Sequence, residues 1–260
     1  MNVIVCIKQV PDTTEVKIDP VSKNLVREGV KSIINPFDMY AIEEAVRLKE
    51  KHGGKAIVLT MGPPQAEAVL REAISLGCDE AVLVSDRAFA GSDTLATGYT
   101  LSKAIEKIKD YDVVICGKQA VDGDTAQVGP GIAATLDIPQ ITYVRKIEEI
   151  KDKTIRAERA TEEGYEVVES SLPCLITVVK EINTPRLPSL KGKIKAKSAP
   201  VQVWKAADIG AEENRIGLKG SPTWVFSIFT PPPRPKGTIF EGEAQHNVNQ
   251  LVDAMKGIIY

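Results

Sequence analysis

The loop at residues 117–128 contains the residue types best suited to binding a ligand. It follows the apolar run "DVVIC" and carries Asp122, Gly123, Asp124 and Thr125 ahead of the next predicted helix. Backbone amides at a helix start, together with the helix dipole, favour anions. The loop therefore predicts a phosphate site formed by the amides of residues 124–127 and the Thr125 hydroxyl. An elaborate structural turn without a ligand is the alternative.

The two aspartates of this loop need an explanation, because carboxylates repel phosphate. Asp122 and Asp124 fit if they bind backbone amides of the loop or accept hydrogen bonds from sugar hydroxyls. Gly123 between them is expected to adopt a special φ or to allow close approach of a ligand. The loop has neither the Gly-Lys-Ser/Thr ending of a P-loop nor a GxGxxG pattern.

Other candidate ligand residues lie after predicted strands or near the start of a predicted helix. They are Ser92, Asp93, Thr94 and Thr97 in "GSDTLATGYTL", Asn35 and Asp38 in "INPFD", and Gly62 in "TMGPP". Helix capping is the alternative for the first two segments, and a flexible strand-to-helix turn is the alternative for the third. Two polar loops on neighbouring strand ends could together hold a ligand larger than a mononucleotide.

Residues for independent catalysis are not apparent. His52 and His246 have no neighbouring nucleophile or metal-ligand partner, and no GxSxG or HExxH motif occurs. The four cysteines are scattered and form no CxxC pair, so neither a zinc site nor a redox dithiol is indicated. If electrons move through this protein, a cofactor must carry them.

The elements that position these loops alternate between strands and helices. Short apolar runs at 2–7, 56–60, 80–85 and 112–117 predict buried strands, and helical patterns occupy 37–51, 65–76 and 94–109. Such alternation is typical of a doubly wound α/β domain with a mainly parallel sheet. Ligands bind beyond the carboxyl ends of strands in such a sheet, so the polar loops should converge.

Three regions depart from this alternation. Residues 16–29 predict a β-hairpin insertion, and 143–179 predict antiparallel strands at an edge of the sheet, "CLITVVK" among them. Regular patterning then thins out in a proline-rich and basic region. We expect a nucleotide-binding domain at 1–180 and a long C-terminal arm at 181–260.

Composition excludes several other classes. The chain has 33 lysines and arginines and 35 acidic residues. A domain-wide basic surface for binding nucleic acid or a membrane is therefore not expected. No signal peptide or long apolar span is evident, and the scattered cysteines suit a reducing compartment. The sequence therefore predicts a cytoplasmic protein without a membrane insertion.

Several motifs together resemble the β subunit of electron transfer flavoprotein over essentially the whole chain. They are "IKQVPDT", "INPFDMYAIEEAVRLKE", "TMGPP", "GKQAVDGDTAQVGP" and "AERATEEGYEVVESSLPCLIT". The last is similar to the family signature, with Arg159, Glu162, Glu163, Glu166, Pro173 and Thr177 in place. The resemblance implies a Rossmann-like core, and an arm that wraps an FAD-carrying α subunit in a heterodimer.

The resemblance also implies a nucleotide in the β-subunit pocket. Ordinary members hold AMP there, whereas electron-bifurcating members hold a second FAD beside which NADH binds. The loops "DGDTAQVGP" and "DRAFAGSDTLATGYTL" are similar to those of the bifurcating type. The pocket residues implied are Cys6, Asn35, Asp38, Met61, Gly117, Asp122, Gly123, Asp124, Thr125, Ala126, Gln127 and Val128, with Asp93, Thr94 and Thr97 added for a flavin.

The implied activity is electron transfer from NADH through this FAD to two acceptors. One electron goes to the α-subunit FAD and on to an acyl-CoA-type dehydrogenase, and the other goes to ferredoxin or flavodoxin. Leu190 aligns with the apolar residue that docks on the dehydrogenase, although the residues alone favour a flexible basic linker there.

The aromatic residues of the arm carry a further expectation, because they are costly to leave in water. Trp204, Trp224, Phe226 and Phe229 are expected to be buried on the α subunit.

The alternatives to the whole interpretation are a β subunit with structural AMP, a nucleotide sensor of the universal-stress type, or a separate NAD dehydrogenase. The last lacks an evident proton donor or acceptor.

Overall fold

The computed structural model describes residues 1–12, 32–226, 232, 234 and 236–259. The predicted hairpin at 16–29 lies outside these residues. Two compact units are present, Met1–Phe226 and Ser227–Tyr260. The first contains the sheet and the predicted site, and the second contains one described helix.

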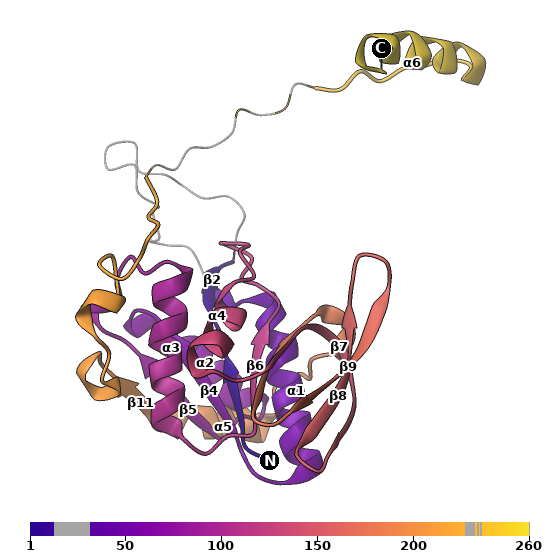
Figure 1. Ribbon diagram of the computed structural model, residues 1–260. Coiled ribbons are helices and arrows are strands. Elements are labelled where there is room, and N and C mark those ends of the chain that lie inside the picture. The colour runs from indigo at the N-terminus through magenta and orange to yellow at the C-terminus, as the bar shows by residue number, and fades with distance from the viewer. Residues whose placement is uncertain (13–31, 227–231, 233, 235, 260) are drawn as a thin grey trace. The chain divides into compact units, whose positions relative to one another are not determined.

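The first unit is built on a nine-stranded sheet, with strand order β11-β5-β4-β1-β6-β10-β7-β8-β9 (Figure 1). All neighbouring strands from β11 to β7 are parallel, and β7, β8 and β9 are antiparallel. A separate two-stranded antiparallel sheet pairs β2 with β3. The strands are β1 (Val3–Cys6), β2 (Gln9–Pro11), β3 (Ser32–Ile34), β4 (Ala56–Met61), β5 (Glu80–Val84), β6 (Val113–Gly117), β7 (Gln140–Lys151), β8 (Thr154–Ala160), β9 (Tyr165–Ser171), β10 (Cys174–Val178) and β11 (Val201–Trp204).

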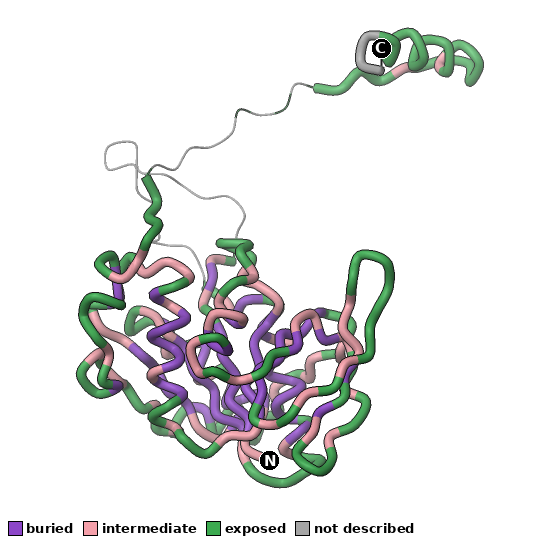
Figure 2. Tube along the Cα trace, in the orientation of Figure 1, coloured by how far each residue is buried: buried purple, intermediate pink, exposed green. Residues whose placement is uncertain are grey.

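Helices cover both faces of the parallel strands. Alternate residues of each strand point to opposite faces, so Val3 and Val5 enter one hydrophobic cluster, and Ile4 and Cys6 enter the other. The first cluster includes residues of α1, α2 and α5, and the second includes residues of α3 and α4. Figure 2 shows buried residues concentrated in the central strands. The helices of this unit are α1 (Pro36–His52), α2 (Glu67–Leu76), α3 (Thr94–Ile108), α4 (Val128–Leu136) and α5 (Leu190–Ser198). The predicted doubly wound α/β fold is confirmed.

The expected antiparallel edge is present, with one correction. β7, β8 and β9 form it, but the segment "CLITV" is the central parallel strand β10 between β6 and β7. All five residues of β10 are buried. A run that is apolar on both faces suits a strand with neighbours on both sides and helices above and below, not an edge.

Residues 183–226 add regular elements to the first unit. β11 pairs with β5 at the far edge of the sheet, and α5 packs on α2. Trp204 in β11 is half-buried, and the Lys107 ammonium lies 4.5 Å from its ring. Trp204 thus packs in part within this chain, and its further burial on the α subunit stays a prediction. Trp224 and Phe226 remain exposed, at 70% and 92%, and Phe229 lies outside the described residues.

The second unit contains α6 (Ala244–Ile259), whose described side chains are mostly exposed. No described helix of the chain is long and apolar enough to cross a membrane. The proposed division at residue 180, and the wrapping of a partner by residues 181–260, stay predictions.

Candidate functional site

The predicted ligand residues gather beyond the C-terminal ends of β1 and β6. From β1 the chain passes to β4 and β5 on one side, and then crosses to β6 on the other. The strand order thus reverses between β1 and β6, which is where ligands bind in sheets of this type. We call this region the switch-point site, and its main segment is the β6–α4 loop at residues 118–127.

Asn35 fixes the shape of the β6–α4 loop. Its side-chain amide donates to the Gln119 carbonyl at 2.8 Å, and its Oδ1 accepts from the Val121 amide at 3.0 Å. The residue is buried, and Pro36 begins α1 immediately after it. Asn35 stands at the N-cap position of α1, but its side chain makes no capping hydrogen bond, so side-chain capping does not explain this residue. Its contacts are those of a support for the loop.

Asp38 joins the ends of the two central strands. Its carboxylate accepts from the Lys8 amide beyond β1, at 2.7 Å, and from the Gly117 amide at the end of β6. Gly117 has to be a glycine, because an added Cβ would lie 2.3 Å from Asp38 Oδ1. Burial raises the pKa of Asp38 to about 7, against the opposing effect of hydrogen bonds from Asn35, Lys8 and Gly117.

The structure explains both acids of the loop. Asp122 Oδ1 forms an ion pair with Lys8 Nζ at 2.7 Å, and Asp124 Oδ1 accepts from the Gln119 side chain. The Asp124 amide donates to the Ala120 carbonyl, and Asp124 and Ala126 both have positive φ values, 53° and 54°. Both acids therefore bind groups of this chain.

Gly123 is not held by a special conformation. It lacks a positive φ, and an added Cβ would meet nothing within 4 Å. The expected special φ is wrong, whereas close approach of a ligand at this position stays a prediction. Close packing does restrict Gly129 in α4, since its Cβ would lie 2.7 Å from Thr177 Cγ2.

The start of α4 is available for an anion. Gln127 precedes the helix without a side-chain cap, and Val128 and Gly129 are its first residues. The first amides of a helix have no partner within it. Thr125 and Gln127 are exposed, and Ala126 and Val128 are half-buried. Uncapped amides beside an exposed loop are the feature expected of a phosphate site.

α3 differs, because its N-terminus is already capped. Asp93 Oδ1 accepts from the Leu95 and Ala96 amides, and its Oδ2 accepts from the amide and hydroxyl of Thr223. The capping alternative is therefore correct for Asp93, and a flavin contact stays a prediction. Thr94 connects the two helix starts by donating its hydroxyl to Gln127 Oε1 at 2.9 Å.

The remaining predicted residues lie at strand ends or nearby. Cys6 ends β1 and is buried beside Cys116, its register partner in β6. A hydrogen bond with the Cys6 thiol, together with burial, raises the pKa of the Cys116 thiol. Met61 ends β4 and is half-buried, and Thr97 is half-buried in α3.

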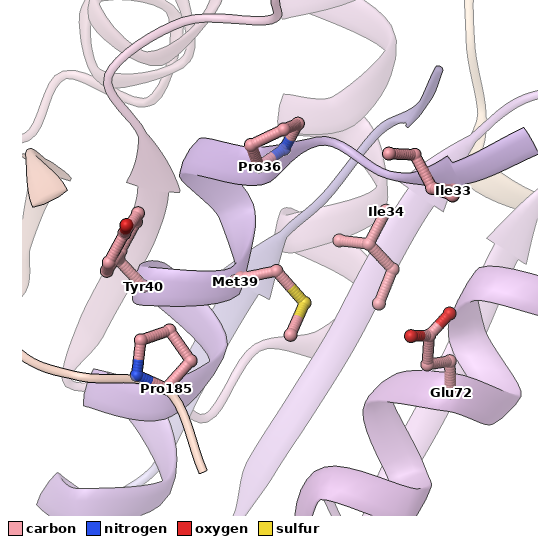
Figure 3. Close-up of a pocket in the computed structure, with 7 residues that line it drawn as sticks. All are labelled: Ile33, Ile34, Pro36, Met39, Tyr40, Glu72 and Pro185. Carbon is pink, nitrogen blue, oxygen red and sulfur yellow. The ribbon is translucent and has the colours of Figure 1, made fainter. Parts of the chain in front are cut away.

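A separate hollow lies between β3, α1 and α2 (Figure 3). Glu72 is its one charged lining residue, and the other lining residues are Ile33, Ile34, Pro36, Met39, Tyr40 and Pro185. Figure 3 shows Met39 and Ile34 directed into it. An apolar lining with a single carboxylate does not suit phosphate, so the switch-point site remains the better nucleotide candidate.

Leu190 begins α5 and is 77% exposed. Ser189 caps this helix through the Gly192 amide, and Gly192 lies so close to α2 that an added Cβ would be 2.2 Å from the Ser75 carbonyl oxygen. Leu187 and Ile194 are also exposed. The expected flexible linker is thus a helix packed on the sheet domain, and docking through Leu190 stays a prediction.

Three supporting residues escaped the sequence analysis. They are Gln119, Thr223 and Ser221, whose hydroxyl accepts from the Asp93 amide. Lys8, which lies at the end of the first predicted strand, also supports the site through its ion pair with Asp122. Ser221 and Thr223 lie about 130 residues from Asp93 and gave no local signal.

The known proteins that are similar to this chain belong to one family. The electron transfer flavoprotein domain family matches residues 22–209. Electron transfer flavoprotein subunit beta of Thermoanaerobacterium thermosaccharolyticum is 57% identical over 256 residues, covering 98% of both chains. The caffeyl-CoA reductase-Etf complex subunit CarD of Acetobacterium woodii is 49% identical, covering 98% of both, and protein FixA of Bradyrhizobium diazoefficiens is 47% identical, covering 98% of this chain and 91% of FixA.

The chain therefore belongs to the electron transfer flavoprotein family, and within it to the β subunits. These subunits take part in electron transfer and pair with an α subunit. Membership of a flavoprotein family implies a flavin-related cofactor.

Proposed function

We propose that the switch-point site binds FAD, and that the complex with the α subunit is electron-bifurcating. The observation that carries the proposal is the uncapped start of α4 beside an exposed loop, at the place where strand order reverses. In this role the amides of residues 125–128 and the Thr125 hydroxyl hold phosphate, whereas the Asp124 amide already donates to the Ala120 carbonyl. Asn35, Asp38 and Gly117 hold the loop.

The extent of the site favours a dinucleotide over AMP. The starts of α3 and α4 are joined through Thr94 and Gln127, so Asp93, Thr94 and Thr97 extend the binding face beyond the phosphate loop. AMP bound in a structural role is the second candidate, because its single phosphate needs only the α4 side. Cys6 and Met61 contribute apolar contacts from the ends of β1 and β4.

The chemistry of the proposal comes from the cofactor. Bound FAD would accept a hydride from NADH and release electrons one at a time. This chain binds and orients it, and no described cluster of three or more metal-ligand side chains competes for that role. The proposed acceptors are the α-subunit flavin, which passes its electron to an acyl-CoA-type dehydrogenase, and ferredoxin or flavodoxin. The name of the CarD relative places that protein in a complex with a caffeyl-CoA reductase.

Coupled electron delivery tests this function. The αβ complex, its dehydrogenase and ferredoxin are mixed anaerobically with NADH, with and without the enoyl-CoA substrate of the dehydrogenase. Bifurcation predicts that ferredoxin is reduced only when the high-potential acceptor is also present. Reduction of the dehydrogenase without any reduction of ferredoxin or flavodoxin favours the AMP-binding alternative.

A further inference from the structure

Lys8 is a charged residue of the switch-point site that is not among the predicted cofactor-binding residues. It follows β1 directly, and its backbone amide donates to the buried Asp38 carboxylate at 2.7 Å. Its main chain is therefore fixed at the site. Its side chain is 48% exposed and extends to the β6–α4 loop.

The partner of Lys8 is a residue of the predicted phosphate loop. Nζ lies 2.7 Å from Asp122 Oδ1, and the Asp122 side chain is 35% exposed. The pair connects the segments that follow β1 and β6, the two strands between which the strand order reverses. An ion pair between side chains this exposed is weak, so its members can exchange partners at low cost.

The local charges favour such an exchange. Asp122 and Asp124 are the acids of the loop, and both repel an incoming phosphate. The neighbouring Lys118 is turned to aromatic rings, with Nζ 6.0 Å from the Phe37 centroid and 5.4 Å from the Tyr143 centroid. The ammonium of Lys8 is thus the cation that the described structure pairs with this loop.

We infer that Lys8 is a phosphate-binding residue of this site and that Asp122 competes with the phosphate for it. In the free site the ammonium pairs with Asp122, and in the occupied site it pairs with a phosphoryl group of the nucleotide. The inference rests on the proposed nucleotide site, and it assigns opposite roles to the two members of one ion pair. Lys8 increases affinity for phosphate, and Asp122 decreases it.

Opposite effects of two charge removals test the inference. The αβ complex is stripped of nucleotide, and binding of AMP, FAD and adenosine is measured by calorimetry at low ionic strength. Lys8→Gln should weaken AMP and FAD binding about tenfold, as expected for a lost charge-assisted hydrogen bond. Asp122→Asn should strengthen both about threefold, because it frees Lys8 and removes a repulsive charge. Adenosine, which lacks phosphate, should bind wild type and both variants equally.

A matched pair of controls exists at the other end of the strands. Lys55 and Glu80 form an ion pair of 2.9 Å with side chains 40% and 41% exposed, at the starts of β4 and β5. Lys55→Gln and Glu80→Gln make the same charge changes and should leave nucleotide affinity unchanged. Lys8→Arg should keep most of the affinity that Lys8→Gln loses.

Two outcomes overturn the inference and are distinguishable. If Lys8→Gln and Asp122→Asn weaken AMP and FAD binding alike, or if Lys8→Gln weakens adenosine binding equally, the pair holds the loop and does not select phosphate. If the wild-type complex rebinds neither AMP nor FAD, the proposed nucleotide site falls, and this inference falls with it.

Discussion

Asp38 is the residue on which the geometry of the site depends most. Its buried carboxyl group binds the amides of Lys8 and Gly117, and so connects the ends of β1 and β6. The sequence predicted it as a pocket residue, but its role as a connection between two strand ends requires the tertiary structure. The same holds for Asn35, whose hydrogen bonds reach residues 84 and 86 positions away.

Asp38 predicts a pH dependence of stability. Burial raises its pKa from 3.8 to about 7, so between these values the folded state holds a proton that the unfolded state has lost. Its contribution to the free energy of unfolding is therefore full at acidic pH and falls as pH rises through 7. Between pH 5 and pH 8 the fall should be on the order of 2 kcal/mol.

Urea unfolding of wild type and Asp38→Asn at pH 5 and pH 8 checks this expectation. The variant should lack this pH-dependent fall, because a side-chain amide does not titrate. Asp79→Asn, which alters an aspartate before the start of β5, should keep the wild-type fall. Equal pH dependence in wild type and Asp38→Asn would contradict the assignment.

Gly117 provides a steric prediction. A Cβ there would lie 2.3 Å from Asp38 Oδ1 and 2.7 Å from the Phe37 carbonyl carbon, so Gly117→Ala should displace the start of α1 and lower stability by about 2 kcal/mol. Gly131→Ala is the control, because its Cβ meets nothing within 4 Å inside α4. That change should be neutral or stabilising. Thermal melts compare the two, and a tolerated Gly117→Ala would refute the close packing.

The elements show which parts of the fold are encoded locally. The helices predicted at 37–51 and 94–109 correspond to α1 and α3 within one residue at each end, because their apolar periodicity is continuous. β10 was misplaced at an edge because its apolar run is compatible with several pairings. β11 was missed because it is a short strand whose two middle residues are exposed, and because its partner β5 lies over 100 residues earlier.

The side-chain caps of α3 and α5 predict different effects when each is removed. Asp93→Ala removes the cap of α3 and the hydrogen bonds to Thr223, so stability should fall by about 1–2 kcal/mol. Hydrogen exchange at Leu95 and Thr223 should increase together. Ser189→Ala, which removes the cap of α5, should accelerate exchange at Gly192 without affecting Thr223. Unchanged protection of Thr223 in Asp93→Ala would contradict the connection.

At the scale of the molecule, electron transfer requires surfaces for partners as well as a cofactor site. Leu190 is 77% exposed on a helix that also carries lysines at 191, 193, 195 and 197. An exposed apolar residue among cations suits docking on a partner with an apolar pocket and an acidic rim. This surface and the switch-point site are formed by different elements, so changes at one should spare the other.

Leu190→Ala should therefore slow electron delivery to the dehydrogenase about 30-fold, equivalent to about 2 kcal/mol, as for a lost interface residue. Reduction of the flavins by NADH should be unchanged. Val203→Ala, which shortens another exposed aliphatic side chain of the first unit, should affect neither rate. Stopped-flow absorbance of the αβ complex with its dehydrogenase measures both steps, and equal delivery by wild type and Leu190→Ala would exclude the docking role.

The nucleotide content of the purified αβ complex tests the central claim most directly. The complex is denatured, and the released FAD and AMP are separated and quantified against protein. FAD in the switch-point site predicts two FAD and no AMP per heterodimer, and Gly117→Ala in this chain should release one of the two. One FAD together with one AMP per heterodimer would contradict the claim and leave this chain a carrier subunit with a structural nucleotide.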